Sequence, residues 1–352
     1  MHIKNKKYFL VKGDAKVTNY KLMKKARESK NISLEKLSNV TGINVKVIEE
    51  IEAGERELTL EEAEKIGDFL EVVSDELLGF AEFDDEEGDE IIMKLNKTVV
   101  IVTATNKGGE GKTSTTSNLG YCLAEMGYRV LLVDSDGQKN LTQSYGLDTD
   151  EEKNFYNALT NKESLLEHAI HTGYDNLDIV TGDSRMKQID GFIATHPLAE
   201  KHPVSMINPV RKAGVYDFVL IDTNPTISKL NTAIMCTADK VLIPLEAGAF
   251  GISGLGNIIE CVNEIKEYYP NVDVLGILLN KVDGRVTLNS EVRDIVGEVF
   301  EDKRLTTEIS QDTNIKNAQW QGVPLPVYNK NSKASADYRR LAREVVQIVK
   351  TN

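Results

Sequence analysis

The sequence NKGGEGKTS at residues 106–114 is the strongest indication of the fold of this chain. It follows the apolar run TVVIVTA (98–104) and precedes a helical pattern, which is the strand–loop–helix context of a phosphate-binding loop. Glycines let backbone N–H groups converge on phosphate oxygens, and the start of the helix adds a partial positive charge. We therefore expect a nucleoside triphosphate here, with Lys112 on its β- and γ-phosphates and the Thr113 hydroxyl on Mg²⁺. The loop residues predicted to bind the nucleotide are Gly108, Gly109, Glu110, Gly111, Lys112, Thr113 and Ser114.

Four more apolar, β-rich runs follow the loop, with helical patterns between them. They are RVLLVD (129–134), DFVLID (217–222), KVLIPL (240–245) and VDVLGILLN (272–280). Continuous apolar runs of this kind are typical of strands buried on both faces. Strands that alternate with helices predict βαβ crossovers. We therefore expect an α/β fold with a mostly parallel, doubly wound sheet, as in P-loop NTPases.

An acidic block, EFDDEEGDE at residues 82–90, divides the chain. Seven of its nine residues are acids, so the block repels itself and is typical of a solvated linker. Before it, apolar residues recur at helical spacing. We predict a basic N-terminal arm at 1–19, a small all-α domain at 20–80, an acidic linker at 81–95 and the nucleotide-binding domain at 96–352.

Composition excludes several classes of protein. The 352 residues include 55 acids and 42 bases, a net charge of −13, and 41% are apolar. This balance is globular, and it excludes a uniformly basic protein but not a local basic patch. No apolar run approaches the ~18 residues of a membrane span, and no secretory segment is recognisable at the N-terminus. The three scattered cysteines cannot form a disulfide framework. We expect a cytoplasmic protein.

The phosphate loop departs from the standard pattern at its start, where Asn106 replaces the usual first glycine and Lys107 adds a second lysine. A KGGxGKT loop marks the deviant Walker A ATPases, and residues 98–352 resemble the ParA/MinD family. In that family the extra lysine reaches the nucleotide of the partner subunit. The resemblance therefore implies an ATP-sandwich homodimer in which Lys107 acts catalytically in trans. The alternative is that Lys107 is a solvated loop lysine.

Acidic residues at two strand ends extend the resemblance. The segment DSDGQ (134–138) resembles the family's DxDPQ element, with Gly137 in place of proline. By this match Asp136 orients the attacking water, and Asp222 is a Walker B aspartate that holds Mg²⁺ through water. The expected metal-site residues are Thr113, Asp134 and Asp222. Either aspartate taken alone would equally suit a helix N-cap.

The base of the nucleotide is harder to predict. Asn280 opens the sequence NKVD (280–283), which looks like the guanine-binding element of GTPases but also suits the equivalent stretch of ParA ATPases. We favour ATP over GTP, and Asn280 is the expected base contact in either case.

The C-terminal sequence indicates the branch of the family. The pattern through 309–341 resembles plasmid and chromosome partition ATPases, and the tail lacks the bulky apolar face of a membrane-binding helix. Six bases and two acids lie in 330–350. Contacts with DNA phosphates and a merely solvated helix face are both open interpretations of this charge. The tail residues predicted to bind DNA are Lys330, Lys333, Arg339, Arg340 and Arg343.

The N-terminal segment 23–79 resembles a Cro/C1-type helix-turn-helix domain, with helix two near 33–40 and the recognition helix near 44–52. The expected DNA-reading residues are Asn44, Val45, Lys46 and Glu50. Segment 20–80 holds 14 acids and 9 bases, which opposes phosphate binding. Operator binding and a dimerisation or partner-docking role therefore both remain open. Glu52 is expected to tie the helices together.

These observations predict a ParA-type partition ATPase that dimerises with ATP and Mg²⁺ and binds non-specific DNA. The resemblance implies that a ParB-like centromere-binding partner stimulates hydrolysis and that the protein associates with the nucleoid rather than a membrane. The alternatives are a nucleotide-switched transcriptional regulator and, less favoured, a MinD-like positioning ATPase.

Overall fold

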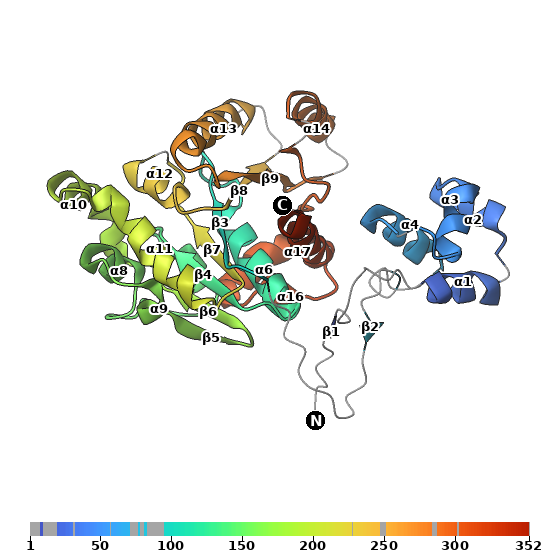
Figure 1. Ribbon diagram of the computed structural model, residues 1–352, viewed down its shortest axis with the longest axis horizontal. Coiled ribbons are helices and arrows are strands. Elements are labelled where there is room, and N and C mark those ends of the chain that lie inside the picture. Colours follow the sequence, from blue (N-terminus) through green and yellow to red (C-terminus); the bar gives the residue numbers. More distant parts are fainter. Residues whose placement is uncertain are drawn as a thin grey trace. The chain divides into compact units, whose positions relative to one another are not determined.

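The computed structural model describes residues 8–9, 20–30, 32–56, 58–70, 77, 81–82, 95–226, 228–246, 251–283, 287–300 and 303–351. The chain forms two compact units, Met1–Met93 and Lys94–Asn352 (Figure 1). The predicted arm and acidic linker lie almost entirely outside the described residues, so their boundaries stay predictions. The described parts of both are short strands, β1 (Tyr8–Phe9) and β2 (Ala81–Glu82), which pair antiparallel, together with Leu95 at the end of the linker.

The described core of the first unit is helical, as expected for the helix-turn-helix domain. Its helices are α1 (Tyr20–Ser29), α2 (Leu34–Thr41), α3 (Val45–Glu52) and α4 (Leu60–Leu70). Ser33 caps α2 by accepting a hydrogen bond from the Lys36 N–H, and Gly42 ends it at φ 72°, where glycine carries no steric penalty. The apolar stripes of the helices meet in one core, whose fully buried members include Met23, Leu37, Ile48, Ile51 and Ile66.

An ion pair joins α3, the predicted recognition helix, to α1. The Arg27 guanidinium donates to both carboxylate oxygens of Glu52, at 2.7 and 2.8 Å. The pairing with Glu52 raises the pKa of Arg27. Such two-point pairs hold geometry as well as charge. The predicted structural role of Glu52 is therefore confirmed.

In its described residues the second unit is built on a seven-stranded sheet in the order β5-β6-β4-β7-β3-β8-β9, in which only β5 and β6 pair antiparallel. The strands are β3 (Val99–Thr103), β4 (Val130–Asp134), β5 (Ile170–Tyr174), β6 (Leu177–Val180), β7 (Phe218–Asp222), β8 (Lys240–Glu246) and β9 (Asp273–Asn280). All five predicted strands are present. The β5–β6 hairpin was not predicted, because β5 is half exposed and its sequence IHTGY carries no apolar run.

Helices cover both faces of this sheet (Figure 1). On one face α6 (Lys112–Glu125) packs against β4 and β7, and α17 (Lys333–Thr351) packs on α6. The other described helices are α7 (Asn140–Gln143), α8 (Phe155–Asn161), α9 (Leu165–His168), α10 (Ile189–Thr195), α11 (His202–Ala213), α12 (Lys229–Met235), α13 (Gly251–Tyr268), α14 (Thr287–Val299), α15 (Thr313–Gln321) and α16 (Leu325–Tyr328). The arrangement confirms the doubly wound α/β prediction.

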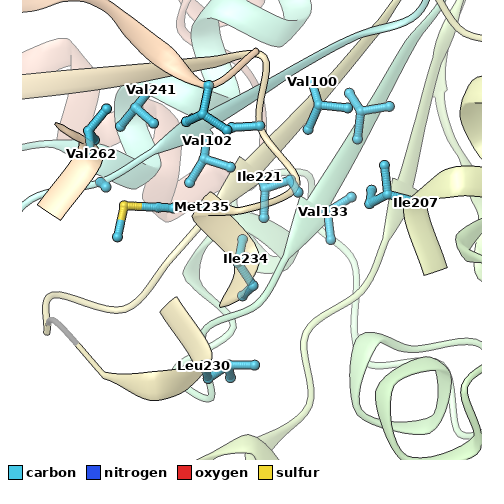
Figure 2. Packing of buried hydrophobic residues seen from close by; sticks show 14 of the residues in the cluster. Val100, Val102, Val133, Ile207, Ile221, Leu230, Ile234, Met235, Val241 and Val262 are labelled. Carbon is cyan, nitrogen blue, oxygen red and sulfur yellow. The ribbon is translucent and has the colours of Figure 1, made fainter. Parts of the chain in front are cut away.

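Strand residues alternate between two apolar layers. Figure 2 shows Val100, Val102, Val133 and Ile221 from the central strands packed with residues of α11 to α13, such as Ile207. Every residue of β3, β4 and β7 is buried, which explains why these strands read as continuous apolar runs.

The register of the central strands brings their carboxyl ends to one edge. Asp222 at the end of β7 lies opposite Thr103 of β3 and opposite Asp134 of β4. The phosphate loop leaves β3 at this same edge, where ligands of open α/β sheets bind. The fold therefore places the predicted loop and both predicted aspartates together.

Candidate nucleotide-binding site

The phosphate loop connects β3 to α6 and is shaped by two glycines in the left-handed region, Gly109 (φ 87°) and Gly111 (φ 89°). Lys112, the first residue of α6, is buried, and its Nζ donates to Thr105 Oγ1 at 2.9 Å. Burial lowers the pKa of Lys112, while the charges of Asp222, Glu110 and Asp136 oppose that shift. An anionic ligand would compensate this partly desolvated ammonium group directly.

Thr113 and Asp222 form the part of the site that suits a divalent cation. Thr113 Oγ1 donates to Asp222 Oδ2 at 2.7 Å, while Asp222 Oδ1 is buried and has no hydrogen-bond partner among the described residues. Burial and the neighbouring charge of Asp134 raise the pKa of Asp222 to about 8. A cation would keep Asp222 ionised. Mg²⁺ is typically held by one or two protein oxygens with substrate phosphates and water, and these residues fit that requirement.

Asp134 differs from Asp222 because both its oxygens are already engaged. Oδ2 accepts hydrogen bonds from the Thr142 N–H (2.9 Å) and hydroxyl (2.7 Å), and Oδ1 accepts one from the Asp136 N–H (3.2 Å). Burial raises the pKa of Asp134 to about 6. In this structure Asp134 fixes the loop that follows β4, and its metal role stays a prediction.

Asp136 lies in that loop, partly exposed, with its Oδ1 accepting from the Gln138 N–H at 3.0 Å. Its charge acts on the pKa of both Lys112 and Asp222, so it lies near these two residues. Gly137 follows where the family has proline, and a Cβ there would lie 2.9 Å from the backbone nitrogen of Lys187. Close backbone packing therefore explains the glycine.

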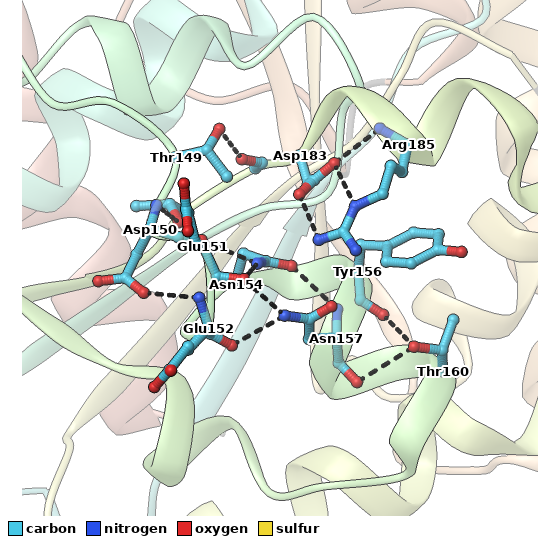
Figure 3. A network of polar contacts seen from close by, with 12 residues as sticks. Thr149, Asp150, Glu151, Glu152, Asn154, Tyr156, Asn157, Thr160, Asp183 and Arg185 are labelled. Carbon is cyan, nitrogen blue, oxygen red and sulfur yellow. Dashed lines mark hydrogen bonds and ion pairs between the residues drawn. The ribbon is translucent and has the colours of Figure 1, made fainter.

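A polar network supports the segment against which Gly137 packs (Figure 3). Asp183 caps the 3₁₀ helix Ser184–Gln188 and pairs with the Arg185 guanidinium at 2.7 Å. The same guanidinium lies 4.3 Å from the centre of the Tyr156 ring, a cation–π contact. Asn154 and Asn157 tie the preceding loop to the start of α8. The network holds the backbone on which the Asp136 loop rests.

Asn280 and Lys281 are not part of the phosphate loop, but both donate hydrogen bonds to its backbone. Asn280, at the end of β9, is 2% exposed, and its Nδ2 donates to the carbonyl oxygen of Glu110 at 3.1 Å. Lys281 Nζ donates to the carbonyl oxygen of Gly109 at 2.6 Å. The sequence predicts Asn280 as a base contact, and this stays a prediction. The sequence did not predict that Asn280 and Lys281 donate hydrogen bonds to the backbone of the loop.

Glu110 is an acid inside the phosphate loop and is 4% exposed. Burial raises its pKa to about 7, against the opposing charges of Lys107, Lys112 and Lys281, while Glu246 raises the pKa further. The raised pKa means that the folded chain binds the proton more tightly than the unfolded chain does. Ionisation of Glu110 therefore costs folding stability as pH rises between its ordinary range and about 7.

Glu110→Gln should make nucleotide binding less dependent on pH. Ionised Glu110 repels phosphate, so we expect ATP affinity of the unsubstituted chain to fall as pH rises from 6 to 8. A single linked proton limits this change to about tenfold per pH unit. Calorimetric titration of Mg–ATP at both pH values measures it, with exposed Glu167→Gln as the matched control. Equal pH dependence in Glu110→Gln and the unsubstituted chain would contradict the assignment.

Four of the five predicted DNA-binding residues of the tail fall into two groups, and the fifth, Arg343, is half-buried in α17. Arg339 donates to both oxygens of Glu125 in α6, at 2.7 and 2.9 Å, and Arg340 pairs with Asp337. Lys330 and Lys333 are exposed. The charge of both arginines is thus already compensated within the chain, which a count of bases could not show.

Three of the predicted DNA-reading residues, Asn44, Val45 and Lys46, lie at the start of α3, and Glu50 lies in its last turn. Asn44 caps this helix by accepting from the Lys46 N–H at 2.9 Å, so part of its hydrogen-bonding capacity is used. Asn44 and Lys46 are exposed, and Val45 and Glu50 are half-buried. Within the described residues of this unit, all four are at least partly exposed.

Comparison with known proteins agrees with both units. A family model described as an AAA domain matches residues 98–274, and a helix-turn-helix model matches residues 23–78. The chromosome partitioning protein ParA of Caulobacter vibrioides is 29% identical over 256 residues, covering 72% of this chain and 96% of its own length. The sporulation initiation inhibitor protein Soj of Bacillus subtilis is 30% identical over 249 residues, covering 70% and 97%.

Two solved structures have a similar fold over most of this chain. The septum site-determining protein MinD of Pyrococcus horikoshii, solved with Mg-ADP, is 26% identical, with a TM-score of 0.60 over 72% of this chain and 98% of that one. Apo McdA from Cyanothece shares the fold, with a TM-score of 0.63, 21% identity, and coverage of 71% and 99%. In the described residues no helix is long and apolar enough to cross a membrane.

Proposed function

The chain belongs to the ParA family of deviant Walker A ATPases, and we propose that it partitions DNA. In this proposal it forms an ATP-sandwich dimer, binds DNA without sequence preference, and hydrolyses ATP when a ParB-like centromere-binding partner stimulates it. The observation that carries the proposal is the grouping of the KGGEGKT loop with Asp136 and Asp222 at one edge of the sheet.

The chain is a Mg²⁺-dependent P-loop ATP hydrolase by family. Thr113 and Asp222 would hold the Mg²⁺, whose charge offsets that of the phosphates. Lys112 stabilises phosphate charge from within the loop. Asp136 would accept a hydrogen bond from the attacking water and so orient it. In this proposal the loop binds the nucleotide, and Asp136, which follows β4, orients the water.

Lys107 would supply the trans contact of the dimer. Its side chain is exposed at the start of the loop, where a second subunit could meet it. We expect Lys107→Ala to keep ATP binding by the monomer but to lose ATP-dependent dimerisation, because phosphate charge at the interface would be left uncompensated. Analytical ultracentrifugation with Mg–ATP and with ADP measures this. Lys212→Ala, at an exposed lysine of α11, is the control, and an undiminished ATP-dependent dimer in Lys107→Ala would contradict the trans role.

DNA binding would come from the exposed lysines of the tail and from the helix-turn-helix domain. Lys330 and Lys333 are exposed, and among the described residues neither forms an ion pair that DNA phosphates would have to break. The exposed start of α3 suits operator binding, which would make the chain its own regulator. We propose partition as the main function because a chromosome partitioning protein is among the relatives that match this chain over most of their length. In that role the protein would work in the cytoplasm, on the nucleoid.

A further inference from the structure

The end of β9 holds two carbonyl groups of the phosphate loop. Lys281 Nζ donates to Gly109 O at 2.6 Å, and Asn280 Nδ2 donates to Glu110 O at 3.1 Å. These are consecutive peptide groups in the part of the loop that precedes Lys112. The contacts join residues about 170 positions apart in the sequence.

Fixing a carbonyl fixes the N–H of the same peptide. In a planar trans peptide the C=O and the N–H point in opposite directions. The bond to Gly109 O therefore sets the direction of the Glu110 N–H, and the bond to Glu110 O sets that of the Gly111 N–H. Because a phosphate loop binds its ligand through backbone N–H groups, these two donors determine how well phosphate fits.

The two side chains are themselves held in place. Asn280 Oδ1 accepts from the Lys281 N–H at 2.8 Å, and the Lys281 ammonium group pairs with Glu246 of β8 at 2.7 Å. Lys281 has φ 54°, a left-handed conformation uncommon for a residue with a side chain. A Cβ at Gly111 would lie 2.1 Å from Asn280 Nδ2, so the loop closes directly against the amide.

We propose that Asn280 and Lys281 are positioning residues that orient the phosphate-binding N–H groups of the loop, with Glu246 holding Lys281. This inference rests on the proposed nucleotide-binding function and gives Asn280 a task that is independent of the base. The pair acts on the triphosphate through the loop backbone. Its substitution weakens binding of any triphosphate, whichever base is attached or none.

The test compares three ligands, namely Mg–ATP, Mg–GTP and inorganic triphosphate with Mg²⁺. Loss of a charge-assisted hydrogen bond should weaken binding about ten- to a hundredfold. We expect Lys281→Met to weaken all three ligands by similar factors and to leave the ratio of ATP to GTP affinity unchanged. Lys281→Arg should recover part of the loss, and Asn280→Ala should behave like Lys281→Met. Calorimetry measures the affinities and thermal unfolding checks the fold.

Lys266→Met is the matched control, because Lys266 forms a surface ion pair with Asp273 at 3.2 Å and touches no loop residue in the described contacts. It should change none of the three affinities. Unchanged triphosphate binding in Lys281→Met and Asn280→Ala would overturn the inference. A changed ratio of ATP to GTP affinity in Asn280→Ala would show instead that Asn280 recognises the base. Failure of the unsubstituted chain to bind any of the ligands would instead contradict the proposed function itself.

Discussion

Lys112→Ala is expected to weaken ATP binding severely. The Lys112 ammonium group is buried beside Thr105 and is the cation that the loop offers to the phosphates. Removing one partner of a buried charge pair costs about 2–5 kcal/mol, which corresponds to a loss of affinity of about 30-fold to several thousandfold. Calorimetric titration of Mg–ATP gives the affinity directly.

Unfolding cannot explain this loss if the nucleotide-free variant is as stable as the unsubstituted chain. Burial lowers the pKa of Lys112, so the charged group is held at a cost when no ligand is present. We therefore expect the thermal midpoint of Lys112→Ala without nucleotide to be no lower. Lys266→Ala controls for loss of a lysine elsewhere. Retained ATP affinity in Lys112→Ala would contradict the assignment of the loop.

Asp136→Asn is expected to keep ATP binding and to slow hydrolysis by about 10²–10⁴-fold, the usual range for a group that assists proton transfer in the transition state. The substitution retains an Oδ1 that can accept from the Gln138 N–H, so the shape of the loop is preserved. Phosphate release under single-turnover conditions measures the chemical step. Exposed Asp148→Asn is the control. Undiminished turnover in Asp136→Asn would move the orienting role to another residue.

Much of the fold could be predicted because buried elements have a simple pattern of apolar residues in the sequence. Strands such as β3 and β7 are covered on both faces and are apolar throughout, and the spacing of the phosphate loop is local. The β5–β6 hairpin was missed for the opposite reason, since β5 lies at the edge of the sheet and only one of its residues, Thr172, is buried. Local patterns therefore predict central elements better than edge elements.

Long-range contacts account for what the sequence could not show in the site. The grip of Asn280 on Glu110 and the pairing of Arg339 with Glu125 each join segments more than a hundred residues apart. The fit of Gly137 against Lys187 likewise depends on how two loops pack. A motif identifies the residue types in such cases, but the packing decides which atoms are engaged.

In the proposed function, ATP controls binding to bulk DNA. The most direct measurement is a titration of the Asp136→Asn chain on random-sequence duplex DNA and on its own promoter, with Mg–ATP or Mg–ADP, over a series of salt concentrations. We predict tight binding to random DNA with ATP, much weaker binding with ADP, and a linear fall of log affinity with log salt. Equal affinity for random DNA with ATP and ADP, or binding confined to the promoter, would rule out ATP-controlled partition and favour a transcriptional regulator.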